Sequence, residues 1–111
     1  MKKYALLLIM GLLALASCTD RAKRPEVFLD EPTMIDVLTD AYLIEAQLNQ
    51  KKTAGVDVTD LQVAYYNQLF EHYGITDTVF EANMYYYTHQ LPTLERIMDS
   101  VMNRFLEAQK K

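Results

Sequence analysis

The chain has 111 residues, a net charge of −4 at pH 7 and a single cysteine. This length suits one small domain and is too short for two. The acidic balance argues against a nucleic-acid binder, because such proteins gain much of their affinity by neutralising phosphates. One thiol cannot form an intramolecular disulfide, so packing alone must stabilise the fold.

Residues 1–17 are typical of a bacterial lipoprotein signal peptide. Two lysines form a cationic start, and an apolar run follows over residues 5–16. The four residues that end at Cys18, Leu-Ala-Ser-Cys, have the form of a cleavage and acylation box. We therefore expect a mature chain that begins at a lipidated Cys18. The apolar run is shorter than the roughly 20 residues that span a bilayer, which disfavours a permanent transmembrane helix.

Residues 18–29 are predicted to be the acylated cysteine and a short tether. Arg21, Lys23 and Arg24 precede Pro25 in this segment, and helical periodicity is missing from its first half. As a flexible chain, the tether would hold the domain on the order of 20 Å from the membrane. Its cations could attract anionic head groups, although a solvated linker with incidental charge is the simpler interpretation.

Residues 30–111 are predicted to form a helical domain. Asp30 can cap a first helix that runs from about Glu31 to Lys51, and a connector over residues 53–58 follows. A second helix is expected from about Thr59 to Tyr73, with Gly74 just past its end. The apolar side of the first helix comprises Met34, Val37, Leu38, Ala41, Ile44 and Leu48.

Two more helices are predicted in the last third of the chain. Thr76 can cap the third helix, and Pro92 stands where the fourth one begins. The cleanest apolar stripe belongs to the fourth helix and comprises Leu94, Ile97, Met98, Val101, Met102 and Phe105. Short connections favour antiparallel neighbours, so the sequence predicts an all-α fold, a small bundle of three or four antiparallel helices.

The chain offers few side chains for catalysis or metal binding. Ser100 is the only serine outside the signal peptide, and no glycine-rich loop is present to hold phosphate. His72 and His89 stand alone in sequence, each in the last turn of a predicted helix, where a partial positive charge is favourable. We therefore predict no enzymatic activity, no cofactor and no metal site.

Glu45 is the most suggestive single residue, because helical spacing places it between Ala41 and Leu48 on an apolar side. A buried carboxylate there would need a partner such as a tyrosine hydroxyl, His72 or an arginine, and could serve a ligand or partner groove. The simpler interpretation is an edge position whose side chain reaches water.

Three consecutive tyrosines, Tyr85, Tyr86 and Tyr87, occupy the third predicted helix. They span most of a helical turn, so they cannot all face one core. Because tyrosine recurs at binding surfaces, we expect at least one of them to contact a partner. The alternative is a bundle packed with tyrosine in place of leucine, with the hydroxyl groups reaching solvent.

The order of these elements resembles a family of small Bacteroidota lipoproteins that carry a domain of unknown function (DUF4296). The similarity rests on the Met-Ile-Asp-Val-Leu-Thr-Asp run at 34–40, the Tyr-Gly-Ile-Thr segment at 73–76, Phe80 and the tyrosines that follow it. The resemblance implies an envelope lipoprotein of a Gram-negative bacterium and carries no catalytic residues. In that phylum an acidic cluster just after the acylated cysteine is associated with surface export, whereas here basic residues follow Asp20. The resemblance therefore implies the periplasmic face of the outer membrane, with the cell surface as the alternative.

These observations lead to a functional hypothesis. We expect a membrane-anchored, non-enzymatic helical module that binds another cell-envelope protein through candidates Tyr85, Tyr86, Tyr87 and Glu45. The alternative is a carrier of a small ligand or metal that uses Glu45 and a histidine. A third possibility is an enzyme, or the obligate subunit of an enzyme, whose site is assembled from residues far apart in sequence.

Overall fold

The computed structural model describes residues 22–110, and all regular structure in this range is helical. The four helices are α2 (Glu31–Thr53), α3 (Thr59–Tyr73), α4 (Asp77–Thr88) and α5 (Leu91–Gln109). This confirms the predicted all-α class and the small helical bundle. No helix within the described range has both the length and the hydropathy needed to cross a bilayer. The signal peptide and Cys18 lie outside the described residues.

The helix ends follow the capping residues that the sequence predicts. The Asp30 carboxylate accepts a hydrogen bond from the Thr33 N–H at 3.0 Å, and the Thr76 hydroxyl accepts one from the Val79 N–H at 3.2 Å. Gly74 ends α3 with φ at 66°, a left-handed conformation that glycine adopts without steric cost. α2 extends two residues beyond Lys51, an ordinary difference at a fraying helix end.

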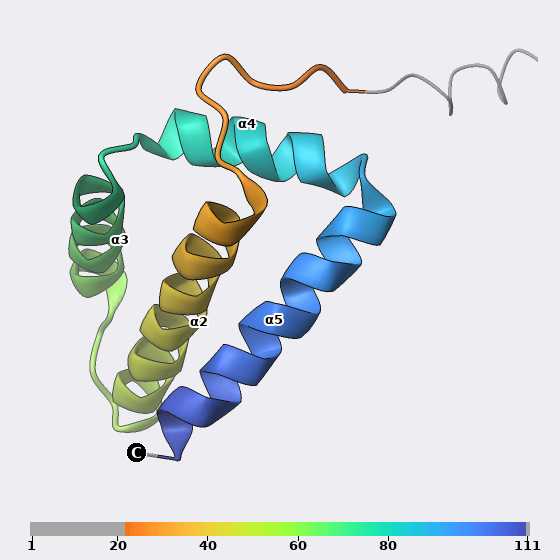
Figure 1. The fold of residues 1–111 in the computed structure, drawn as a ribbon. Coiled ribbons are helices and arrows are strands. Elements are labelled where there is room, and N and C mark those ends of the chain that lie inside the picture. The colour runs from red at the N-terminus through yellow and green to blue at the C-terminus, as the bar shows by residue number, and fades with distance from the viewer. Residues whose placement is uncertain (1–21, 111) are drawn as a thin grey trace, which may run out of the picture.

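α2 is the central helix, with α3 on one side and α5 on the other (Figure 1). α2 and α3 run antiparallel, as their short connection predicts. Their side-chain pairs show this order, because Tyr66 bonds to Glu45 whereas the later Tyr73 bonds to the earlier Asp40.

α2 and α5 instead run parallel. Arg96 pairs with Glu31 near the start of α2, and the later Arg104 pairs with the later Asp36. α4 crosses the end of the molecule at which α2 begins, so α5 starts at that same end (Figure 1). The prediction of antiparallel neighbours therefore holds for α2 and α3 but not for α2 and α5. The reason is that α4, which crosses the end of the molecule, connects α3 to α5 and returns the chain to the end at which α2 begins.

The main core lies where α2, α4 and α5 meet. α3 contributes less, since Leu69 is its single buried residue. α3 therefore packs mainly against α2, and most buried apolar side chains lie among α2, α4 and α5. The buried members of the core cluster are Leu29, Met34, Leu38, Tyr87, Ile97 and Val101.

Residues 27–29, which we call the strap, lie across α4 before α2 begins (Figure 1). Leu29 is only 7% exposed and belongs to the core cluster. The tether predicted over residues 18–29 therefore shares its last three residues with the folded domain. Sequence periodicity does not reveal this contact because the strap has no repeating secondary structure.

Candidate functional site

Asn83 of α4 holds the strap by its main chain. Its fully buried side chain accepts a hydrogen bond from the Leu29 N–H at 2.8 Å and donates one to the Val27 carbonyl at 2.9 Å. The Tyr87 hydroxyl donates to the Leu29 carbonyl at 2.8 Å. Buried main-chain groups need hydrogen-bond partners, and here the side chains of α4 provide them.

Aromatic contacts extend this attachment toward the N-terminus. The Phe28 ring lies edge-to-face with Tyr86 at 5.7 Å between centroids and stacks near Tyr87 at 6.1 Å. The Arg24 guanidinium lies 4.3 Å from the centre of the Phe28 ring. A cation–π contact of this exposed kind is worth about 0.5–1 kcal/mol. Contact with the domain therefore reaches back to residue 24.

Two tyrosine–carboxylate pairs join α3 to α2. The Tyr73 hydroxyl donates to Asp40 Oδ2 at 2.5 Å, and the Tyr66 hydroxyl donates to the Glu45 carboxylate. Burial raises the pKa of both hydroxyls, and the bonded carboxylates raise it further. Both tyrosines therefore remain protonated donors at neutral pH.

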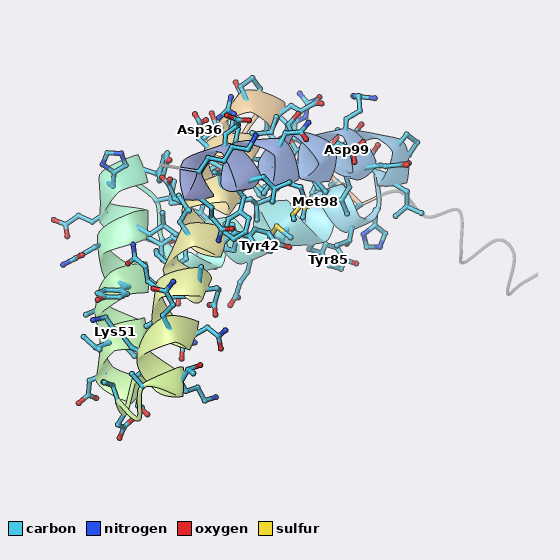
Figure 2. The ribbon with its side chains drawn as sticks, turned by 90° about the horizontal axis from the view of Figure 1, so that it is seen from below. Asp36, Tyr42, Lys51, Tyr85, Met98 and Asp99 are labelled. Carbon is cyan, nitrogen blue, oxygen red and sulfur yellow. The ribbon has the colours of Figure 1, made fainter. Side chains whose placement is uncertain are left out.

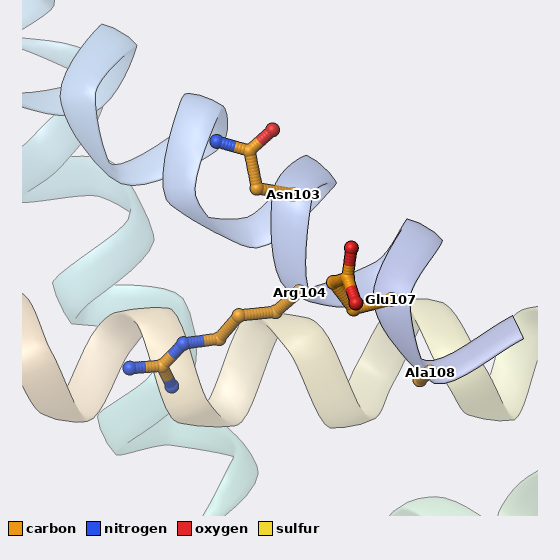
Figure 3. A pocket seen from close by; sticks show the side chains of 4 residues that line it. All are labelled: Asn103, Arg104, Glu107 and Ala108. Atoms are coloured by element: carbon orange, nitrogen blue, oxygen red, sulfur yellow. The ribbon is translucent and has the colours of Figure 1, made fainter. Parts of the chain in front are cut away.

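An ion pair joins α5 to Asp36, which lies one helical turn before Asp40 on α2. The Arg104 side chain reaches from α5 over α2 (Figure 3). Its guanidinium forms an ion pair with the Asp36 carboxylate. The charges of Asp36 and Asp40 raise the pKa of Tyr73, whereas the charge of Arg104 lowers it. These four groups, which we call the Asp40 cluster, therefore form one electrostatic unit drawn from three helices. Arg104 also lines a shallow hollow of about 390 Å³ together with Asn103, Glu107 and Ala108.

An open groove of about 430 Å³, the α2–α3 groove, lies beside this cluster. Its polar lining comprises Asp40, Gln47, Gln68 and His72. Its other lining residues are Leu43, Ile44, Leu69 and Tyr65. Tyr73 occupies only Oδ2 of Asp40, and no other residue in the described range donates a hydrogen bond to this carboxylate. The groove thus combines a carboxylate with amide groups and an apolar lining.

A family model described as a domain of unknown function (DUF4296) matches residues 25–111. The chain belongs to this family. The match includes the strap as well as the four helices, so the DUF4296 domain begins before the first helix. The family description names no enzymatic activity. A search of curated proteins and a search of solved structures found no match.

Glu45 lies at an exposed edge of the DUF4296 domain. Its partner is the hydroxyl of Tyr66, one of the partner types that the sequence suggests. The edge interpretation agrees with this geometry. Glu45 does not line the α2–α3 groove, where Asp40 is the carboxylate instead.

The three consecutive tyrosines occupy three different environments. Tyr87 is 2% exposed in the core, and Tyr86 is half-buried against Phe28. Tyr85 is 63% exposed and lies at the margin of the molecule (Figure 2). The expectation that they cannot share one core is confirmed. A role in partner binding stays a prediction.

The two histidines lie on different elements. His72 is exposed at the end of α3 and lines the α2–α3 groove. His89 follows α4, and its Nδ1 lies 2.8 Å from the Tyr85 carbonyl. Over residues 22–110 no three His, Cys, Asp or Glu side chains are grouped to hold a metal. Glu45, bonded to Tyr66, completes no such group with either histidine.

Sequence reasoning missed Asn83 and the role of Asp40. Asn83 stands three residues after Phe80 and four before Tyr87, so it interrupts the apolar face of α4 with a polar side chain. That interruption was the available signal. Asp40 had no comparable signal, because Tyr73 is 33 residues away in sequence and only folding brings the two together.

Proposed function

We propose that this chain is a lipid-anchored lipoprotein of the cell envelope whose DUF4296 domain is a non-enzymatic module that binds another envelope protein. The observation that carries the proposal is an exposed surface at the junction of α4 and α5. We call it the α4–α5 corner and define it as Tyr85, His89 and Leu91. Tyr85 is 63% exposed and Leu91 is 68% exposed.

The α4–α5 corner has the composition of a protein-binding surface. Tyrosine supplies a large contact area at a small entropic cost and is enriched among the residues that dominate binding energy. The Tyr85 ring lies 4.5 Å from the His89 ring, so the corner presents two packed rings in a defined arrangement. Covering Leu91 would contribute about 1.5–3 kcal/mol. The core needs none of these three side chains.

The lipid anchor is the second part of the proposal. Cys18 stands nine positions before Val27, at which the strap begins. A fully extended chain spans at most about 3.6 Å per residue, so the strap would stay within roughly 30 Å of the lipid. We place the anchor in the outer membrane, on its periplasmic face, because basic rather than acidic residues follow Asp20.

A carrier of a small ligand or metal is the second candidate. The α2–α3 groove is the feature that favours it, since His72 and Asp40 both line this groove. Glu45, the carboxylate expected in such a carrier, is bonded to Tyr66 outside the groove lining. We therefore rank this function below protein binding.

Photocrosslinking in intact cells tests the protein-binding proposal. A benzophenone amino acid at position 85 is expected to form one discrete adduct with an envelope protein. The matched control is position 63 on α3, because Val63 is 60% exposed and lies away from the corner in sequence. The same adducts at both positions, or none at position 85, would contradict the proposal.

Lipid labelling tests the anchor separately. Cys18→Ala is expected to abolish incorporation of labelled fatty acid and to leave an uncleaved precursor. Ser100→Ala is the matched control and should be processed normally. A Cys18→Ala chain that is still labelled and processed would rule out the anchor.

A further inference from the structure

Asp40 is a carboxylate of which one oxygen, Oδ2, accepts a hydrogen bond within the described range. Tyr73 donates to Oδ2, and the raised pKa of Tyr73 keeps that hydroxyl a donor. Arg104, the cation of the Asp40 cluster, is already bound to Asp36. Asp40 is thus held in position and lines the α2–α3 groove, and its second oxygen, Oδ1, accepts no hydrogen bond from the described residues.

The rest of the groove matches a particular kind of ligand. Gln47 and Gln68 add amide oxygens that accept hydrogen bonds, and His72 adds an imidazole ring. Tyr65 adds an aromatic ring, and Leu43 and Ile44 add apolar surface. A guanidinium group carries five donors in one plane and has weakly hydrated faces that stack on aromatic rings.

We infer that the α2–α3 groove binds an arginine side chain from an exposed segment of a partner protein, with Asp40 as its carboxylate. This inference rests on the proposed protein-binding function and names the chemistry of the partner. Arginine fits better than lysine, because a compact ammonium group cannot reach several separated acceptors while contacting the apolar lining. The acidic character of the chain, with a net charge of −4, favours approach of a basic segment.

A defined peptide tests the inference. The probe is a five-residue peptide of glycine, leucine, arginine, leucine and glycine with blocked ends, titrated into the full chain in detergent micelles. Its comparison peptide carries citrulline, which has nearly the shape of arginine but no charge. The arginine peptide is expected to bind at least about tenfold more tightly, since a hydrogen bond to a charged group exceeds that factor.

Two matched variants locate the effect. Asp40→Asn is expected to remove the preference for arginine over citrulline. Asp99→Asn removes an exposed carboxylate from α5 and should preserve the preference (Figure 2). An equal loss in both variants would show general attraction to an acidic protein and would overturn the site.

If the Asp40→Asn variant does not fold, nuclear magnetic resonance on the unaltered chain tests the site instead. The side-chain amide signals of Gln47 and Gln68 are expected to shift with the arginine peptide and not with the citrulline peptide. Equal binding of both peptides, or shifts confined to the α4–α5 corner, would overturn the inference.

The two proposals fail separately. Loss of the adduct at position 85 would count against the protein-binding function. An adduct at that position without any arginine preference in the groove would refute only the further inference.

Discussion

Asn83 accepts a hydrogen bond from the main-chain N–H of Leu29 at 2.8 Å across 54 residues of sequence. The same side chain donates to the Val27 carbonyl, so one amide satisfies two main-chain groups of the strap. The strap is the segment through which the predicted lipid anchor connects to the helices. Asn83 thus satisfies two of the main-chain groups that fix the strap, and the Tyr87 hydroxyl satisfies a third, the Leu29 carbonyl.

Replacing this amide should destabilise the domain. Asn83→Ala leaves the buried Leu29 N–H without a partner, which costs about 1–3 kcal/mol, and also empties the fully buried space of the amide. The Val27 carbonyl loses its partner too, but Val27 is 54% exposed, so water can replace that bond. We expect the free energy of unfolding, measured in urea, to fall by about 2–4 kcal/mol. Asn103→Ala on exposed α5 surface is the control and should stay within about 0.5 kcal/mol. Equal losses would contradict the role of Asn83.

The strap should also behave as part of the core. Leu29 is 7% exposed, so Leu29→Ala should cost about 2–5 kcal/mol and lower the melting temperature in calorimetry. Leu106→Ala makes the same chemical change at a side chain that is 53% exposed, and should have little effect. Matching melting temperatures for the two variants would show that the strap is only a linker.

Truncation of Tyr87 should lower stability, whereas truncation of Tyr85 should weaken partner binding. Tyr87→Ala removes a side chain that is 2% exposed and is expected to cost about 3–5 kcal/mol. Tyr85→Ala should leave stability unchanged within about 0.5 kcal/mol and weaken copurification of the crosslinked partner. Urea unfolding and copurification together check both halves. A Tyr85→Ala chain that unfolds as readily as Tyr87→Ala would place Tyr85 in the core.

Stability should decline in alkaline solution. The pKa values of Tyr66 and Tyr73 are raised above the ordinary 10.0, so the folded state holds these protons more tightly than the unfolded state. Their contribution is fully present below about pH 10 and is lost as the pH rises further. Burial also raises the pKa of Tyr87, so ultraviolet absorbance of tyrosinate should show late ionisations of three tyrosines. Two of these late ionisations should be missing from the Tyr66→Phe, Tyr73→Phe double variant, and that of Tyr87 should remain. If the absorbance that the double variant lacks is instead lost near the ordinary pKa of 10.0, the two hydrogen bonds are not formed in solution.

The Glu45–Tyr66 pair should contribute little to stability. Both Glu45 and part of Tyr66 meet solvent, where such pairs typically contribute less than about 1 kcal/mol. Glu45→Gln should therefore shift the free energy of unfolding by no more than about 0.5 kcal/mol. A thermal melting series with Tyr66→Phe and the double variant isolates the pair. A loss several times larger would mean that the carboxylate is buried in solution.

The sequence alone determined the helices and most of their ends. Asp30, Thr76 and Gly74 act on main-chain groups within a few residues of themselves, and the 3.6-residue repeat of apolar side chains is equally local. The same local geometry showed that Tyr85, Tyr86 and Tyr87 could not all be buried. It did not show which of them would be.

The tertiary structure decided every relationship that depends on distant partners. α2 and α5 run parallel because α4 crosses the end of the bundle. The lengths of the short connections do not predict this crossing. The Tyr73–Asp40 contact joins side chains 33 residues apart, and the hydrogen bond from Tyr87 to the strap joins groups 58 residues apart. Capping and periodicity act over a few residues, whereas these contacts exist only after the helices pack, so the strap and the groove could be found only in the folded chain.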